Sequence, residues 1–234
     1  MRAVILAGGL GMRLRPYTTI LPKPLVPVGD RPILEHILRR LSACGVTNVD
    51  LCVSHLGELI QTYFSQSRTV PEGLELRWFW EDEPLGTAGA LNVVPDLDAT
   101  FIAMNGDVLT TIDYRDLVAH HRASGAALTV AMHTKAVPID LGVIDSQDGF
   151  ITGYTEKPTL HYDVSMGIYV YEPRAMELLP PGPSQFPDLV HTLIAAGEKV
   201  GAYRTDAEWY DIGTLAEYER AVGDMEDRPE MFAT

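Results

Sequence analysis

Residues 3–9 read Ala3-Val4-Ile5-Leu6-Ala7-Gly8-Gly9, an apolar run that leads directly into a glycine-rich turn. The apolar residues predict a buried strand, and the glycines, with Gly11 after them, let the backbone turn sharply. Successive N–H groups in such a turn can approach phosphate oxygens closely. The stretch therefore predicts a phosphate-binding turn at the end of the first strand.

Two basic side chains follow this turn. Arg13 comes shortly after Gly11, and Lys23 stands between Pro22 and Pro24. The prolines fix their own φ angles and restrict the residues before them, so we expect Lys23 on a stiff extended segment. Together these cations suit a ligand of high negative charge, such as a triphosphate. The alternative is a plain glycine turn with surface arginines, which the length of the whole run disfavours.

Two better-known phosphate motifs do not fit this run. A P-loop needs a Lys-Ser or Lys-Thr pair at a set distance from its glycines, and none is present. A dinucleotide fingerprint needs a third glycine where this chain has Leu14. A Rossmann oxidoreductase is therefore disfavoured.

Composition narrows the class of protein further. The chain has 234 residues with a net charge of −14, which argues against a nucleic-acid surface. Its two cysteines, Cys44 and Cys52, form neither a disulfide framework nor a zinc motif. No leader segment precedes the first strand and no run is long enough to span a bilayer. We expect a cytoplasmic enzyme without membrane or nucleic-acid partners, with one domain over 1–223 and a flexible acidic tail over 224–234.

The order of expected elements indicates an α/β fold. Strands and helices alternate in the first half, which implies a parallel sheet. The expected elements there are a helix over 32–44, a strand over 49–53, a helix over 56–64, a strand over 74–79, a helix over 87–94 and a strand over 101–104. Four closely spaced strands follow between 127 and 171, and antiparallel pairs are expected among them; helices over 186–196 and 215–222 come last. We predict a Rossmann-like open, mixed, mostly parallel sheet flanked by helices, with a small antiparallel subregion.

Two carboxylates follow apolar stretches at distant points of the chain. Asp107 ends the turn Asn105-Gly106-Asp107, and Asp211 lies in Trp209-Tyr210-Asp211-Ile212-Gly213. Ligands of open α/β sheets bind beyond the carboxyl ends of strands, where the glycine turn also lies. Paired carboxylates suit Mg²⁺, which prefers oxygen ligands. The alternatives are a turn aspartate and a helix cap.

Taken together, these motifs resemble the sugar-1-phosphate nucleotidylyltransferases. The shared elements are Gly-Gly-x-Gly-x-Arg-Leu with Pro-Lys-Pro-Leu, Asn-Gly-Asp and Trp-x-Asp-Ile-Gly. The resemblance implies nucleotidyl transfer from a nucleoside triphosphate to a sugar 1-phosphate, with Arg13, Lys23 and Asp107 catalytic and Asp107 and Asp211 holding Mg²⁺. At Met12 the family usually has threonine, so a hydroxyl is missing there.

The segment from Glu81 to Leu91 contains Glu-Pro-Leu-Gly-Thr-Ala-Gly and closely resembles mannose-1-phosphate guanylyltransferases. Guanine offers N–H donors that suit an ionised carboxylate such as Glu81, so GTP is favoured. Uridylyl or thymidylyl transfer remains the alternative. The resemblance implies a nucleotide-binding set of Leu6, Ala7, Gly8, Gly9, Gly11, Met12, Arg13, Glu81, Pro84, Gly86, Thr87, Asn105 and Gly106.

The sugar-phosphate side rests on shorter resemblances. Glu156-Lys157-Pro158 matches the family's Glu-Lys-Pro element, and Gly142 and Gly167 match glycines near the sugar. Ser165 stands where many members have asparagine, which leaves the sugar open between mannose, heptose and cyclitol phosphates. A nucleotide-sugar binding protein without turnover is the rival from another class. It is disfavoured because a pure binder does not need the aspartate pair. A homodimer is the candidate assembly.

Overall fold

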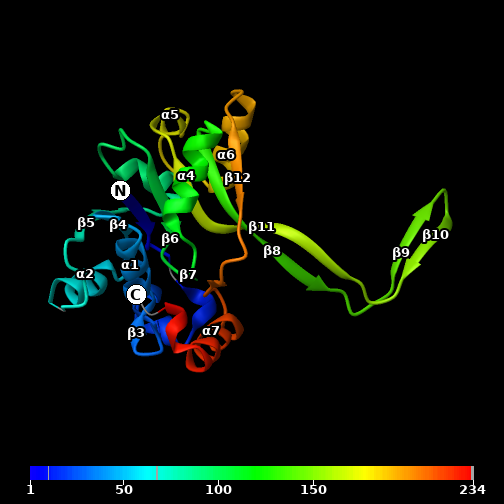
Figure 1. Cartoon of the computed structure of the whole chain (residues 1–234), viewed down its shortest axis with the longest axis horizontal. Coiled ribbons are helices and arrows are strands. Elements are labelled where there is room, and N and C mark those ends of the chain that lie inside the picture. The colour runs from blue at the N-terminus through cyan, green and yellow to red at the C-terminus, as the bar shows by residue number, and fades with distance from the viewer. Residues whose placement is uncertain (10, 67, 233–234) are drawn as a thin grey trace.

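The computed structural model describes residues 1–9, 11–66 and 68–232. Its body is a seven-stranded sheet with helices packed on both faces (Figure 1). The strands stand in the order β12-β8-β11-β6-β1-β4-β5. Their bounds are β1 Arg2–Leu6, β4 Asn48–Val53, β5 Glu75–Trp80, β6 Phe101–Asn105, β8 Leu128–Pro138, β11 Thr159–Tyr171 and β12 Val200–Arg204.

The sheet is mixed and mostly parallel, which confirms the predicted fold class. Strands β6, β1, β4 and β5 run parallel to one another, and β12 runs parallel to β8. Only β11, among the strands of the described sheet, runs antiparallel to both of its neighbours, β6 and β8. Parallel neighbours need long crossovers, which is why helices separate these strands in the chain.

The helices match most of the predicted ranges. Their bounds are α1 Ile33–Ala43, α2 Gly57–Gln66, α3 Gly86–Gly89, α4 Tyr114–Ser124, α5 Pro173–Met176, α6 Phe186–Ala195 and α7 Leu215–Asp227, with 3₁₀ turns η1 Met12–Leu14, η2 Tyr17–Thr19, η3 Lys23–Leu25, η4 Ala90–Val93 and η5 Pro229–Phe232. The single helix expected over 87–94 is instead α3 followed by η4. Within the described ranges, none of these helices combines the length and hydropathy needed to cross a bilayer.

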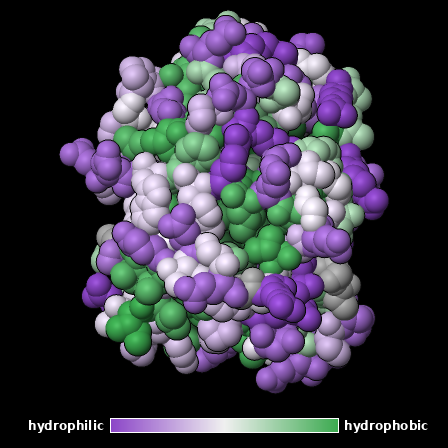
Figure 2. Space-filling view, turned by 90° about the vertical axis from the view of Figure 1, so that its left-hand side faces the viewer, coloured by the Kyte–Doolittle hydropathy of each residue, from purple (hydrophilic) through white to green (hydrophobic). Residues whose placement is uncertain are grey.

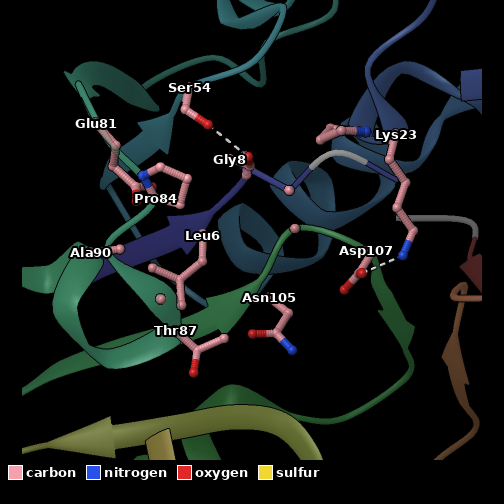
Figure 3. Close-up of a pocket in the computed structure, with 15 residues that line it drawn as sticks. Leu6, Gly8, Lys23, Ser54, Glu81, Pro84, Thr87, Ala90, Asn105 and Asp107 are labelled. Carbon is pink, nitrogen blue, oxygen red and sulfur yellow. Dashed lines mark hydrogen bonds and ion pairs between the residues drawn. The ribbon is translucent and has the colours of Figure 1, made fainter. Parts of the chain in front are cut away.

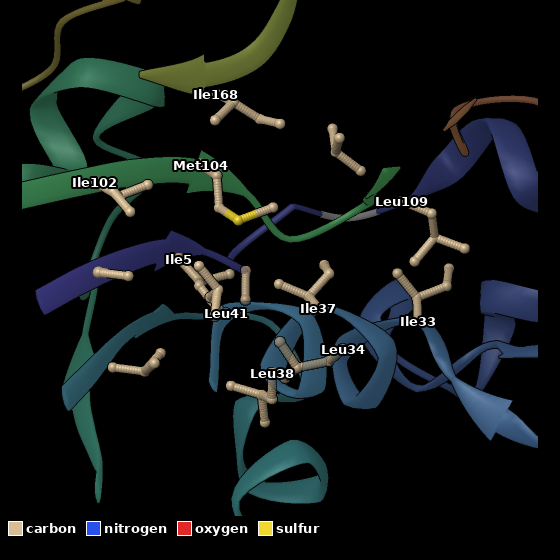
Figure 4. Packing of buried hydrophobic residues seen from close by; sticks show 14 of the residues in the cluster. Ile5, Ile33, Leu34, Ile37, Leu38, Leu41, Ile102, Met104, Leu109 and Ile168 are labelled. Atoms are coloured by element: carbon tan, nitrogen blue, oxygen red, sulfur yellow. The ribbon is translucent and has the colours of Figure 1, made fainter. Parts of the chain in front are cut away.

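The core lies on both faces of the sheet, so β1 is apolar from Ala3 to Leu6 rather than alternating. Ile5 packs with Leu38 and Leu41 of α1 on one face (Figure 4). Val4 belongs to the second cluster, which contains Leu189 and Leu193 of α6. Burial of these side chains holds the carboxyl end of β1 in a fixed position.

Two short ladders stand beside the sheet. Strands β7 Val108–Thr110 and β13 Trp209–Asp211 pair antiparallel, with Asp211 opposite Val108. Strands β2 Pro27–Val28 and β3 Arg31–Pro32 form the other ladder. The β7–β13 pairing brings a C-terminal segment to the end of β6.

The antiparallel subregion projects from the body. The outer parts of β8 and β11 continue beyond the sheet and carry the hairpin β9 Val143–Gln147 and β10 Phe150–Thr155 (Figure 1). Asp148 and Gly149 form the hairpin turn with φ of 52° and 86°, as a two-residue turn of this kind requires. We call residues 134–163 the β-arm.

The C-terminal segment differs from the prediction. Helix α7 continues to Asp227, past the expected end at 222, and η5 follows it. Met225 and Phe232 are buried, and the Phe232 ring lies 5.8 Å from that of His36. Residues 224–232 therefore pack on the body, and the predicted flexible tail is wrong for them, because two apolar anchors interrupt the acidic composition. Residues 233–234 of that predicted tail lie outside the described residues.

Figure 2 shows the molecule from the side of α2 and β5, where hydrophobic residues lie in patches among hydrophilic ones. Exposed apolar side chains on these two elements include Leu59 and Trp80. Leu59 can therefore serve as an exposed control for a buried leucine of the core.

We expect Leu41→Ala to lower the free energy of unfolding by about 2–5 kcal/mol, because Leu41 is fully buried between α1 and the sheet. The control Leu59→Ala removes the same atoms from an exposed position and should change it by about 0.5 kcal/mol or less. Urea denaturation measures both. Equal losses in the two variants would contradict the placement of the core.

Candidate active site

A cavity of about 270 Å³ opens beyond the carboxyl ends of β1, β4 and β6 (Figure 3). This is the edge of the sheet where the sequence placed the ligand. The residues that line it are Leu6, Ala7, Gly8, Gly9, Lys23, Pro24, Ser54, Glu81, Pro84, Gly86, Thr87, Ala90, Asn105, Gly106 and Asp107.

Most of the predicted nucleotide residues line this cavity. The exceptions are Gly11, Met12 and Arg13, which are not among its lining residues in the described part of the chain. Met12 is exposed, and Gly11 turns the chain with a φ of 60°. Arg13 lies near Gly213 instead: its Nη2 is 3.4 Å from the position of a Cβ built on Gly213. Arg13 therefore lies beside the segment that carries Asp211.

Sequence analysis missed three lining residues, Pro24, Ser54 and Ala90. Ser54 directly follows β4, and its Oγ donates a 2.6 Å hydrogen bond to the Gly8 carbonyl. The signal that could have identified it is its place, since β4 neighbours β1 and ends at the same edge of the sheet.

The glycine turn is packed so tightly that Gly8 has no room for a side chain. A Cβ there would lie 2.8 Å from Glu81 Oε1 and 2.9 Å from Ser54 Oγ. The facing turn is equally close, because Gly106 N donates to Leu6 O over 2.8 Å. At Gly8 and Gly106 the backbone therefore lines the cavity directly.

Lys23 is the buried cation of the site. It is 9% exposed as a residue, and its Nζ forms an ion pair with Asp107 Oδ2 (Figure 3). Lys23 begins the 3₁₀ turn η3, so the expected extended conformation is wrong for this residue; only Pro22 before it is extended, and Pro24 fits the first turn of a helix. Because Lys is rarely buried unless paired, Asp107 and Lys23 hold each other in position.

Two side-chain oxygens in the cavity, one from a carboxylate and one from an amide, lack a hydrogen-bond partner. Among the described residues, Asp107 Oδ1 and Asn105 Oδ1 are buried without a hydrogen bond. Buried polar atoms normally have partners, so unpaired ones call for an explanation such as a ligand or ion. Asn105 ends β6 and Asp107 follows this strand, so both oxygens lie next to the glycine turn.

Asp211 belongs to the same group of charges although it does not line the cavity. Ile212 N donates to Asp107 O over 3.1 Å, which ties the two segments together. Burial raises the pKa of Asp211, and the nearby Asp107 carboxylate raises it further, while Lys23 and Arg13 oppose the shift. The structure thus brings Arg13, Lys23, Asp107 and Asp211 together.

This donor set fits a hard divalent cation. It offers two carboxylates, one with an unpaired oxygen, and Mg²⁺ is commonly held by one or two carboxylates with water and phosphate completing its shell. No cluster of three or more acidic, histidine or cysteine side chains arranged for a metal occurs in the described residues.

Glu81 lies at the opposite end of the cavity from Lys23 and Asp107, with Gly8 between them (Figure 3). Its Oε2 accepts a 3.1 Å hydrogen bond from Leu85 N. Burial raises the pKa of Glu81, and this hydrogen bond opposes the rise. The cavity is thus polar at both ends.

The loop after Glu81 is fixed by a distant segment. Ser184 O accepts from Ala88 N and Gly89 N over 3.1 and 3.0 Å, and Thr87 Oγ1 accepts from Phe186 N over 2.9 Å. A Cβ on Gly86 would lie 2.6 Å from Ser184 O. This docking explains why the expected helix over 87–94 divides into α3 and η4.

Of the predicted sugar-phosphate residues, Ser165 and Gly167 lie near the cavity. They occupy an irregularity in β11, where Gly167 has a φ of 72° and Ser165 Oγ accepts from Gly167 N over 3.2 Å. A Cβ on Gly167 would lie 2.6 Å from Asn105 Nδ2. Gly167 therefore lies against Asn105, which lines the cavity.

The other three predicted sugar-phosphate residues do not lie near the cavity. Gly142, Glu156 and Lys157 lie on the β-arm, which points away from the body, and they are absent from the cavity lining within the described chain (Figure 1). The prediction that they join the site is wrong for a single chain, because the β8–β11 ladder continues straight out of the sheet. Glu156 Oε2 instead accepts from Tyr154 Oη over 3.1 Å.

Comparisons with known proteins bear on this site. A family model described as Nucleotidyl transferase matches residues 2–228. A UTP-glucose-1-phosphate uridylyltransferase from Synechocystis is 34% identical over 95% of this chain and 62% of its own length. A mannose-1-phosphate guanyltransferase from Schizosaccharomyces pombe is 31% identical over 93% of this chain and 62% of its own. The chain thus spans about 62% of the length of these curated relatives.

A solved structure shares the fold along 96% of this chain. HddC from Yersinia pseudotuberculosis, crystallised in complex with GMP-PN, is 25% identical with a TM-score of 0.71 and covers 96% of this chain and 99% of that chain. The similarity therefore extends beyond the glycine turn to the complete sheet.

We expect Asp211→Asn to leave the stability of the cation-free protein at pH 7 unchanged or raised. A carboxyl whose folded pKa is raised disfavours folding once it ionises, so the difference should vanish below about pH 3, where Asp is protonated in both states. The control Asp50→Asn breaks buried ion pairs to Arg2 and Arg77 and should lower the free energy of unfolding by about 3 kcal/mol. Denaturant titration at several pH values measures both; a large loss in Asp211→Asn would contradict the electrostatic picture.

Proposed function

Because the chain belongs to the nucleotidyl transferase family, we propose that it transfers a nucleotidyl group from a nucleoside triphosphate to a sugar 1-phosphate. The observation that carries the proposal is the convergence of Lys23, Asp107 and Asp211 beside the glycine turn. An oxygen of the sugar phosphate attacks the α-phosphorus, the bond to the β-phosphate breaks, and pyrophosphate leaves. The products are a nucleotide sugar and pyrophosphate.

This reaction needs positioning and charge rather than a protein nucleophile. Backbone N–H groups of the glycine turn would hold phosphate oxygens, since Gly8 and Gly9 present backbone to the cavity. Lys23 and Arg13 would offset the charge that develops during transfer. Lys23 acts from inside the cavity and Arg13 from the side of Asp211.

Asp107 and Asp211 would hold a divalent cation, for which we propose Mg²⁺. The unpaired Asp107 Oδ1 supports this assignment, as does the rise in the pKa of Asp211 beside a second carboxylate. When bound, the cation would neutralise phosphate charge and favour one orientation of the triphosphate. Lys23 keeps Asp107 aimed into the cavity before any cation arrives.

The two ends of the cavity differ, which favours one orientation of a bound nucleotide. Its charged end holds Lys23 and Asp107, and its other end holds Glu81 and Pro84 (Figure 3). We propose that phosphates occupy the first end and the base the second. The sugar phosphate would then enter past Asn105, where Ser165 and Gly167 line the approach through β11.

GTP is the proposed donor. The carboxylate of Glu81 can accept hydrogen bonds from the N–H groups of guanine, whereas uracil and thymine suit an amide that both donates and accepts. The complex of HddC with GMP-PN and the guanyltransferase of S. pombe support this choice, and the uridylyltransferase of Synechocystis supports the alternative. Mannose 1-phosphate or a related heptose or cyclitol phosphate is the proposed acceptor, and the cytoplasm the proposed location.

The experiment measures pyrophosphate release with Mg²⁺, with GTP, UTP or dTTP, and with a panel of sugar 1-phosphates. We expect release with GTP and one acceptor, and a loss of kcat of at least ~100-fold in Asp107→Asn, because the substitution removes a cation ligand and the partner of Lys23. The control Asp116→Asn changes an exposed aspartate of α4 and should retain full activity. No release with any pair would overturn the proposed reaction, and faster release with UTP or dTTP would overturn the base assignment.

A further inference from the structure

Ser54 places a second side-chain oxygen at the Glu81 end of the cavity. Its side chain is half-buried and lines the cavity, and Figure 3 shows it on the same side of Gly8 as Glu81. The two oxygens converge on one point, because a Cβ built on Gly8 would lie 2.9 Å from Ser54 Oγ and 2.8 Å from Glu81 Oε1. The end of the cavity that we assign to the base therefore presents two neighbouring oxygens.

The Ser54 hydroxyl faces a ligand as an acceptor. It has a single proton, which Oγ donates to the Gly8 carbonyl over 2.6 Å. A carbonyl oxygen can only accept, so the direction of this hydrogen bond is fixed. None of the described residues donates to Ser54 Oγ in return, so its lone pairs are available to a bound base.

Glu81 offers one free oxygen beside this hydroxyl. Its Oε2 accepts from Leu85 N over 3.1 Å, whereas Oε1 faces Gly8 and receives no hydrogen bond in the described part of the chain. Oε1 can accept an N–H from a base, and a second N–H next to the first then requires another acceptor. Ser54 Oγ stands where that acceptor is needed.

The backbone holds both groups in place before a ligand arrives. Ser54 directly follows β4 and Glu81 directly follows β5, and Glu81 N donates to Val53 O over 2.9 Å. Ser54 O accepts from Gly57 N over 3.0 Å at the start of α2. Acceptors that are already positioned cost little ordering on binding, so they discriminate between bases effectively.

Two adjacent acceptors match guanine and disfavour uracil. Guanine presents N1–H and its 2-amino group side by side, whereas uracil and thymine present one N–H between two carbonyl oxygens. Glu81 alone can accept the single N–H of uracil, but a uracil carbonyl would then face the lone pairs of Ser54. A polar atom that loses its water without gaining a partner is costly, so Ser54 adds a penalty against pyrimidines.

We propose that Ser54 is a specificity-determining residue whose Oγ accepts a hydrogen bond from the 2-amino group of guanine, while Glu81 Oε1 accepts from N1–H. This assignment rests on the proposed function and names the part of the base that the cavity distinguishes. Inosine triphosphate (ITP) isolates the contact, because its base keeps the N1–H and the carbonyl of guanine and lacks only the amino group.

Isothermal titration calorimetry of the full chain with Mg²⁺ compares the affinities for GTP and ITP. We expect the wild type to bind GTP at least ~5-fold more tightly than ITP, and this ratio to fall to ~2-fold or less in Ser54→Ala, which removes one neutral hydrogen bond. Ser54→Thr keeps the hydroxyl and should keep the ratio. The control Ser65→Ala changes an exposed serine of α2 and should behave as the wild type.

The GTP-to-ITP ratio separates base recognition from a structural role. Loss of the hydrogen bond to Gly8 alone would weaken both nucleotides equally, so an unchanged ratio in Ser54→Ala overturns the proposal. A wild type that binds ITP as tightly as GTP, or binds neither, also overturns it, as does loss of the ratio in Ser54→Thr. Circular dichroism verifies the folding of each variant.

Pyrophosphate release tests the reaction independently of this assignment. A protein that shows the expected ratios but releases no pyrophosphate with any sugar 1-phosphate overturns the proposed reaction and supports the role of Ser54. A protein that releases pyrophosphate from GTP and ITP with equal kcat/KM, in both the wild type and Ser54→Ala, keeps the reaction and overturns the role of Ser54.

Discussion

The site depends on the ion pair between Lys23 and Asp107. A buried lysine needs an opposite charge, and a carboxylate aimed into a cavity needs a cation to hold it there. The pair joins a proline-clamped segment near the start of the chain to the turn after β6. Through Ile212 N, which binds Asp107 O, the same turn holds the segment of Asp211. These two contacts therefore fix the spacing of Lys23, Asp107 and Asp211.

The sheet makes this convergence possible. Parallel strands β1, β4 and β6 end at one edge, so three turns distant in sequence contribute Gly8, Ser54 and Asp107 to one cavity. Burial on both faces of β1 keeps that edge rigid, and the 182–186 segment fixes the loop after Glu81. At Gly8 and Gly106 the backbone itself lines the cavity. A site of this kind recognises charge and shape at low conformational cost.

The sequence was sufficient for the fold class and for the centre of the site, because glycines, prolines and strand-end carboxylates act locally. It was insufficient wherever a tertiary contact decided the outcome. Ser54 carries no motif, and only its place beside β1 brings it to Gly8. The end of α7 depends on Met225 and Phe232 finding a pocket in the body. Glu156 and Lys157 match a motif, but the direction of β8 and β11 carries them away from the cavity (Figure 1).

The most direct test of the central claim is a crystal structure with GTP and Mn²⁺, in which anomalous scattering locates the metal. The account predicts one anomalous peak within about 2.3 Å of oxygens of both Asp107 and Asp211 and of a phosphate, with Lys23 beside the phosphates. A nucleotide bound elsewhere, or a metal that contacts neither aspartate, would contradict it.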